Sequence, residues 1–103
     1  MGPGLVRIDP ATMRVAAVVP LGNLDSTAGL AVGTGGVWVQ GRQPQRPSAA
    51  TIAVDRIDPA TARLVGTFDT QSTAEGLLAA GFGSVWLAQP LTGDLLRIDP
   101  ERV

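Results

Sequence analysis

The sequence R-I-D-P-A-T occupies residues 7–12 and is repeated without change at 56–61, and its first four residues return at 97–100. A second phrase stands upstream of the two later copies, as G-T-G-G-V-W-V at 33–39 and G-F-G-S-V-W-L at 81–87. The step from Arg7 to Arg56 is 49 residues, and that from Trp38 to Trp86 is 48. The chain is therefore built of structural repeats, and no catalytic group recurs with them.

Short apolar segments bounded by glycine, proline and aspartate predict four strands in each repeat. In the clearest repeat, two strands are expected at 51–57 and 63–68, and the next two at 76–80 and 84–88. Four strands in a repeat of this length are typical of a β-propeller blade. The predicted fold class is all-β, with β-propeller blades made of four-stranded antiparallel meanders, in the strand order C-D, A-B-C-D, A-B-C.

This pattern gives a partial propeller of about two blades in a single domain, 1–103, with a partial unit at 1–20, a complete one at 28–69 and a partial one at 76–103. Val6 and Ile8 fall on one face of their predicted strand and Leu5 on the other, so both faces are apolar and should be covered by neighbouring sheets. The two outermost faces then need partners.

Two partners are expected for those faces, and the sequence leaves the choice between them open. Further blades in cis would complete a longer propeller of which the chain is a fragment. Alternatively, copies of the chain in trans assemble, with strands C-D of one copy completing strands A-B of the next. In that arrangement roughly three or four copies would close a ring of six or eight blades, and the surplus strand at 95–99 would fray or swap.

Several conspicuous residues have a structural interpretation. Aspartate before proline favours turns, so Asp9, Asp58 and Asp99 are expected to accept backbone N–H groups rather than to form a carboxylate ring. Trp38 and Trp86 are expected to fill space between neighbouring sheets. The G-x-G pairs precede strands, whereas a phosphate-binding loop would be followed by a helix.

The composition narrows the function. The chain has no cysteine and no histidine, which excludes thiolate nucleophiles, imidazole bases and the usual zinc ligands. A net charge of −1 with scattered arginines gives no basic face for nucleic acid. The first residues lack the basic start and apolar run of a signal peptide, and no apolar segment is long enough to span a membrane. We therefore expect no catalytic residue, metal, cofactor, nucleic-acid partner or membrane contact, and the cellular compartment stays open.

The loop after the first tryptophan strand, 40–50, is longer than its counterpart and is the best place for a variable function. It carries Arg42 and Arg46. The D-A loops of the same rim carry Asn23, Asp25 and Ser26, and Asp69, Gln71, Ser72 and Glu75. The candidate ligand-binding residues are Arg42, Arg46, Asp25, Asp69 and Glu75, where arginine could hold a carboxylate or phosphate of a small molecule or protein. Solvated loop charges are the alternative.

The phrase G-x-G-[GS]-V-W-[VL] followed by R-I-D-P-A-T resembles the YVTN-type and virginiamycin B lyase-like propeller repeats of bacteria. This resemblance covers nearly the whole chain and implies a propeller with a ligand or partner surface on one rim, and it permits an extracytoplasmic location. In the lyase branch a histidine base with an acidic neighbour and a bound magnesium ion is expected. Because this chain has no histidine, no catalytic residue can be assigned from the resemblance.

Three hypotheses for function follow. The leading one is a non-catalytic propeller repeat protein, or a fragment of one, that acts as a binding or assembly scaffold. The alternative is a fragment of a propeller lyase or of a metal-dependent lactonase-like enzyme, based on the acidic D-A loops. The third is a truncated product with no function of its own.

Overall fold

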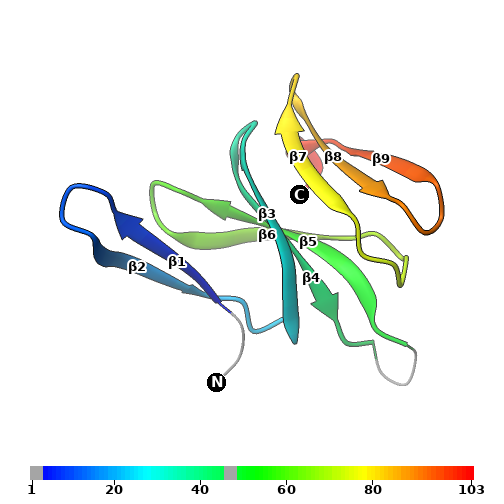
Figure 1. Ribbon diagram of the computed structural model, residues 1–103, viewed down its shortest axis with the longest axis horizontal. Coiled ribbons are helices and arrows are strands. Elements are labelled where there is room, and N and C mark those ends of the chain that lie inside the picture. The colour runs from blue at the N-terminus through cyan, green and yellow to red at the C-terminus, as the bar shows by residue number, and fades with distance from the viewer. Residues whose placement is uncertain (1–3, 46–48) are drawn as a thin grey trace.

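The computed structural model describes residues 4–45 and 49–103, which form nine antiparallel strands in three sheets and one turn of 3-10 helix, η1 (Pro100–Arg102) (Figure 1). The first sheet contains β1 (Gly4–Asp9) and β2 (Arg14–Pro20). The central sheet contains β3 (Ser26–Gly33), β4 (Gly36–Gln43), β5 (Thr51–Asp58) and β6 (Arg63–Asp69). The last sheet contains β7 (Leu77–Gly81), β8 (Ser84–Gln89) and β9 (Asp94–Ile98).

The predicted all-β class and the division into two, four and three strands are confirmed, and strands adjacent in sequence are adjacent in each sheet. One prediction about the connections is wrong. The loop after Trp38 does not begin at Gln40, because β4 continues to Gln43 and pairs with β5 along that length. The extra residues of this repeat therefore lengthen a strand pair as well as a loop.

The turns after the R-I-D phrases are held by the aspartates, as predicted. A carboxylate oxygen of Asp9 accepts the N–H of Ala11 at 2.9 Å, and Asp58 accepts that of Ala60 at 2.9 Å. Asp99 accepts the N–H of Glu101 at 3.0 Å. The side chain of the aspartate thus satisfies a donor that the tight turn would otherwise leave unpaired.

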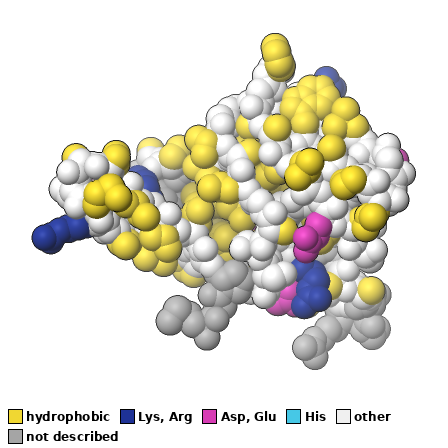
Figure 2. Space-filling view, in the orientation of Figure 1, with side chains coloured by type: hydrophobic (Ala, Val, Ile, Leu, Met, Phe, Trp, Pro, Cys, Tyr) yellow, Lys and Arg dark blue, Asp and Glu magenta, His cyan; other side chains and the backbone are white. Residues whose placement is uncertain are grey.

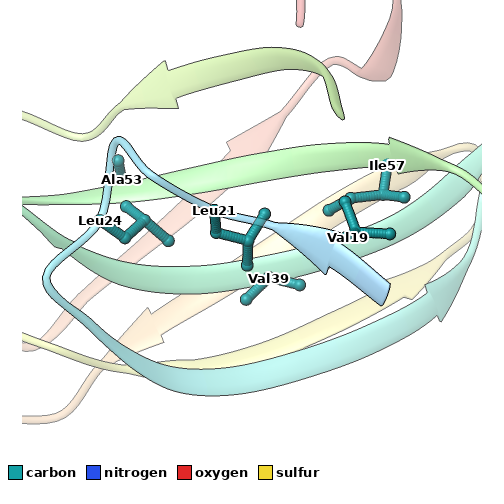
Figure 3. Packing of buried hydrophobic residues seen from close by; sticks show 6 residues of the cluster. All are labelled: Val19, Leu21, Leu24, Val39, Ala53 and Ile57. Carbon is teal, nitrogen blue, oxygen red and sulfur yellow. The ribbon is translucent and has the colours of Figure 1, made fainter. Parts of the chain in front are cut away.

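The two middle strands of the central sheet, β4 and β5, are covered on both faces. On one side Val39, Ala53 and Ile57 pack against the end of β2 and the loop that follows it, in a cluster with Val19, Leu21 and Leu24 (Figure 3). On the other side Trp38 and Val54 pack with Val85 and Ile98 of the last sheet, and strand β3 lies against β7. Alternating residues of β4 and β5 are therefore buried whichever way they point, which explains their continuous apolar character.

The outer faces of the first and last sheets are open in the single chain. On the first sheet, the side chains of Val6, Ile8, Val15 and Val18 are 49–62 % exposed. Hydrophobic side chains cover much of this part of the molecule in Figure 2. Trp38 is fully buried, but its counterpart Trp86 is only half-buried, so the prediction that both fill space between sheets is wrong for Trp86 within one chain. Among the described residues, no further sheet packs against β7–β9 to cover it.

Candidate functional site: a polar rim

Three loops meet at one end of the central sheet. The segment between β2 and β3 is tied there by the N–H of Asp25, which donates to the carbonyl of Arg42 at 2.9 Å. The segment after β6 is tied to the start of β5, where Thr70 and Ser72 bond to the backbone of Ile52. Gln45 and Thr51, on either side of residues 46–48, lie at this end with Asp69, so the described parts of these loops share one rim, as predicted.

Arg42 and Asp25 form a bidentate ion pair on this rim. Arg42 donates from Nε to Asp25 Oδ1 at 2.8 Å and from Nη2 to Oδ2 at 2.9 Å. The hydrogen bonds from Arg42 lower the pKa of Asp25 below its ordinary value of 3.8. The same bonds, with the charges of Asp25 and Glu75, raise the pKa of Arg42. The side chain of Arg42 is 56 % exposed and that of Asp25 is 39 % exposed. A ligand can therefore reach either side chain, but it must compete with the other member of the ion pair.

Asp69 is held by a residue that the sequence did not single out. Gln45 donates from Nε2 to Asp69 Oδ2 at 3.0 Å and to the hydroxyl of Thr51 at 3.3 Å. The other carboxylate oxygen of Asp69 accepts the N–H of Gln71 at 2.7 Å. Asp69 therefore fixes the two loops to each other.

The structure brings some of the predicted ligand-binding residues together and separates others. Asp25 and Arg42 are paired, and the charge of Glu75 lies near enough to contribute to the raised pKa of Arg42. Asp69 belongs to the separate Gln45 network, and Arg46 lies outside the described residues. Within residues 4–45 and 49–103, no three acidic side chains gather as a metal ligand set would. The described residues of the rim offer hydrogen-bonding and ionic contacts.

Two buried polar groups position this rim and were missed in the sequence. Gln40 is fully buried, and its amide donates from Nε2 to the carbonyl of Gly76 at 2.7 Å while its Oε1 accepts the N–H of Gly76 at 2.7 Å. A side chain at position 76 would overlap the carbonyl of Ala88. Gln40 thereby fixes the start of β7 against the central sheet, and the only sequence signal was an amide inside an apolar strand.

The second group is Asp55, also fully buried. Its Oδ1 accepts the Asn23 amide at 2.8 Å and the Thr67 hydroxyl at 2.7 Å. Asn23 comes from the loop before β3, so the buried carboxylate anchors that loop beneath the rim. The corresponding positions in the other repeats hold Val6 and Leu96, and this difference was the signal that could have identified it.

The class that the described strands define is all-β, built from antiparallel sheets. Comparison with known proteins finds no matching family model, no matching curated protein and no matching solved structure. Among the described residues, no helix is long and apolar enough to cross a membrane.

Proposed function

We propose that the three sheets are β-propeller blades and that the chain is a non-catalytic repeat protein serving as a binding and assembly scaffold. The observation that carries the proposal is that one set of contacts occurs at both sheet junctions. Arg7 of the first sheet donates to the carbonyl of Pro59 beside the central sheet at 2.9 Å, and Arg56 donates to that of Pro100 beside the last sheet at 2.7 Å. In a radial array of repeated sheets, each sheet packs on the next through equivalent contacts.

The tryptophans support the same interpretation. The indole N–H of Trp38 donates to the carbonyl of Gly33 at 3.0 Å, and that of Trp86 to the carbonyl of Gly81 at 3.1 Å. Both rings are therefore held in one orientation by their own hairpin, although only one of them is covered. The repeated phrases are accounted for by packing, as expected for a repeat resembling the YVTN-type and virginiamycin B lyase-like propellers.

A ligand surface on the rim around Arg42, Asp25 and Glu75 is part of this proposal. Among the described residues, the rim combines Arg42 with carboxylates on loops that buried Gln40 and Asp55 hold in place. Loops fixed by a rigid scaffold are common binding surfaces. An anionic group would have to displace Asp25 from Arg42, whereas a polar or cationic group would contact the carboxylates directly.

The test is a thermal-shift and calorimetric screen of peptides, sugars and small carboxylic acids, repeated with Arg42→Ala and with Arg63→Ala as the matched control. Arg63 is an exposed arginine at the opposite end of the central sheet. Binding that Arg42→Ala weakens and Arg63→Ala leaves unchanged supports the rim. Turnover of an ester or lactone by the purified chain would overturn the non-catalytic proposal.

A further inference from the structure

An apolar cleft of about 260 Å³ lies between the first and central sheets. It is lined by Leu5, Ile8, Leu30, Val37, Ile57 and Ala62, among others. The cleft adjoins β1, which pairs with β2 along one edge and with no other described strand. Leu30 is 54 % exposed there and Val32 of the same strand is 72 % exposed, so apolar surface of β3 faces water on this side.

The cleft corresponds, residue by residue, to the place where Trp38 is buried. On the last sheet Trp38 packs with Val85 and Ile98, and Leu78 packs against that cluster. The repeat makes Leu30, Val37 and Ile57 the counterparts of Leu78, Val85 and Ile98. All three counterparts line the cleft. The face of the last sheet that receives Trp38 and the face of the central sheet that lines the cleft are therefore equivalent. The cleft, however, has no tryptophan packed in it.

The strand that would bring a tryptophan to this cleft is also identified by the repeat. In the central sheet β5 pairs with β4, which carries Trp38. The counterpart of β5 in the first sheet is β1, and no other described strand pairs with its corresponding edge. The other strand of this sequence equivalent to β4 is β8, which carries the half-buried Trp86 on the open face of the last sheet.

We propose that the β7–β8 hairpin of a second copy pairs with the free edge of β1 and places Trp86 in the cleft. The register of β4 on β5 sets that of the joint: Val37 pairs with Ile57 and Trp38 with Arg56. Val85 of the second copy then stands opposite Ile8, and Trp86 opposite Arg7. The joined sheet has the order β7-β8-β1-β2, which repeats the order β3-β4-β5-β6 of the central sheet.

In this arrangement β1 takes the place that β9 holds within the single chain. The two strands are interchangeable at their ends, since both finish in R-I-D-P. At β8, Ile8 replaces Ile98, and the carbonyl of Pro10 replaces that of Pro100 as the acceptor for Arg56. Exchange of equivalent elements between copies is an accessible route to assembly because each new interaction resembles the one that it replaces.

A second copy is favoured over an unrelated strand because the exchange covers both open surfaces at once. The cleft receives Trp86, and the outward face of β1 and β2 covers the Trp38 side of the second copy. The assembly then contains two four-stranded sheets per copy: the central sheet and one joined sheet. About three or four copies would close a ring of six or eight sheets, which is within the usual range for propellers. The inference rests on the proposed blade architecture and adds the partner and its docking register.

The experiment measures molar mass by light scattering for the intact chain and for three variants. We expect three or four times the 10.6 kDa of one chain. Leu30→Glu blocks the cleft and Trp86→Glu blocks the hairpin, and both positions are solvent-accessible in the single chain, so each variant should remain folded by circular dichroism and fall to one-third or one-quarter of that mass. Met13→Glu, at a turn residue 77 % exposed, is the matched control and should keep the full mass.

Mixing the two blocked variants distinguishes this joint from other contacts. The cleft of Trp86→Glu and the hairpin of Leu30→Glu are both intact, so the mixture should give a heterodimer that stops at two chains. A monomeric intact chain at high concentration, loss of assembly in only one blocked variant, or a mixture without heterodimer would overturn the inference. A monomer that still binds ligand at the rim would leave the proposed function standing.

Trp86 fluorescence gives a second readout. In a Trp38→Phe background Trp86 is the only tryptophan, and its emission should shift to the blue as concentration rises and the indole enters the cleft. The same background with Leu30→Glu should show no shift. A shift that persists with Leu30→Glu would mean that Trp86 is covered elsewhere and would overturn the docking site.

Discussion

Arg56 of the central sheet donates from Nη1 to the backbone carbonyl of Pro100 at 2.7 Å. Its remaining nitrogens bond the carbonyl of Gly35, and its guanidinium lies 5.4 Å from the ring centre of Trp38. The R-I-D-P phrase therefore has a separate task for each polar group. The arginine reaches the next sheet, the aspartate holds the turn, and the proline carbonyl accepts the arginine of the sheet before.

Replacing Arg56 by alanine should destabilise the chain by about 1.5 to 3 kcal/mol, because charge-assisted hydrogen bonds to two carbonyls are removed. Urea unfolding measures the change. Arg63→Ala, at an exposed position of the same sheet, should stay within about 0.5 kcal/mol. Equal effects would show that the junction contact contributes nothing specific.

The two tryptophans should respond differently to truncation. Trp38→Ala leaves a cavity between the central and last sheets and should cost about 3 to 5 kcal/mol. Trp86→Ala should cost clearly less at dilutions where the chain is monomeric, because Trp86 is only half-buried there. Unfolding of both variants at one low concentration is the measurement, and equal losses of stability would contradict the open face of the last sheet.

Gln40→Ala should loosen the start of β7. The N–H of Gly76 loses its acceptor and the carbonyl loses its donor, so hydrogen exchange at the Gly76 amide should accelerate. Gln89→Ala is the control, since Gln89 donates to the carbonyl of Ala74 at 2.9 Å and accepts no bond from Gly76. Unchanged protection at Gly76 in Gln40→Ala would show that this amide is held by other contacts.

The Asp25–Arg42 pair should give a pH-dependent contribution to stability. The pKa of Asp25 is lowered in the folded chain by hydrogen bonds from Arg42, so the unfolded chain binds the proton more readily. The contribution is complete above the ordinary value of 3.8 and is lost as pH falls through the lower folded pKa. The stability difference between the intact chain and Asp25→Asn should be constant from about pH 5 to 7 and shrink below about pH 4. A difference that persists at the lowest pH would exclude the ion pair as its source.

Metal titration tests the enzymatic alternative. Asp25 is engaged by Arg42 and Asp69 by Gln45 and Gln71, so calorimetry with calcium or magnesium should show no binding at the rim. Tight binding that Asp25→Asn and Asp69→Asn both abolish would favour a metal-dependent lactonase-like activity over the scaffold. Binding unaffected by both substitutions would place the metal elsewhere.

Much of the fold was predictable because its signals are local. Glycines and Asp-Pro pairs set the turns, and the identical phrases at 7–12 and 56–61 fixed which strands correspond. The paired rim residues were less predictable. That Arg42 meets Asp25 depends on two segments 17 residues apart in sequence, and nothing in either segment identifies the other.

The sequence by itself determined the strand pattern and the turns held by Asp9, Asp58 and Asp99. It also determined that both faces of each sheet are apolar and need to be covered. These features depend on residues close together in the chain. Only the tertiary structure decided that Trp38 is buried while Trp86 is half-open, and that Arg7 and Arg56 bond across sheets. Those differences depend on which sheet lies next to which, and a repeated sequence gives equivalent residues the same chemistry whether or not a neighbour is present to cover them.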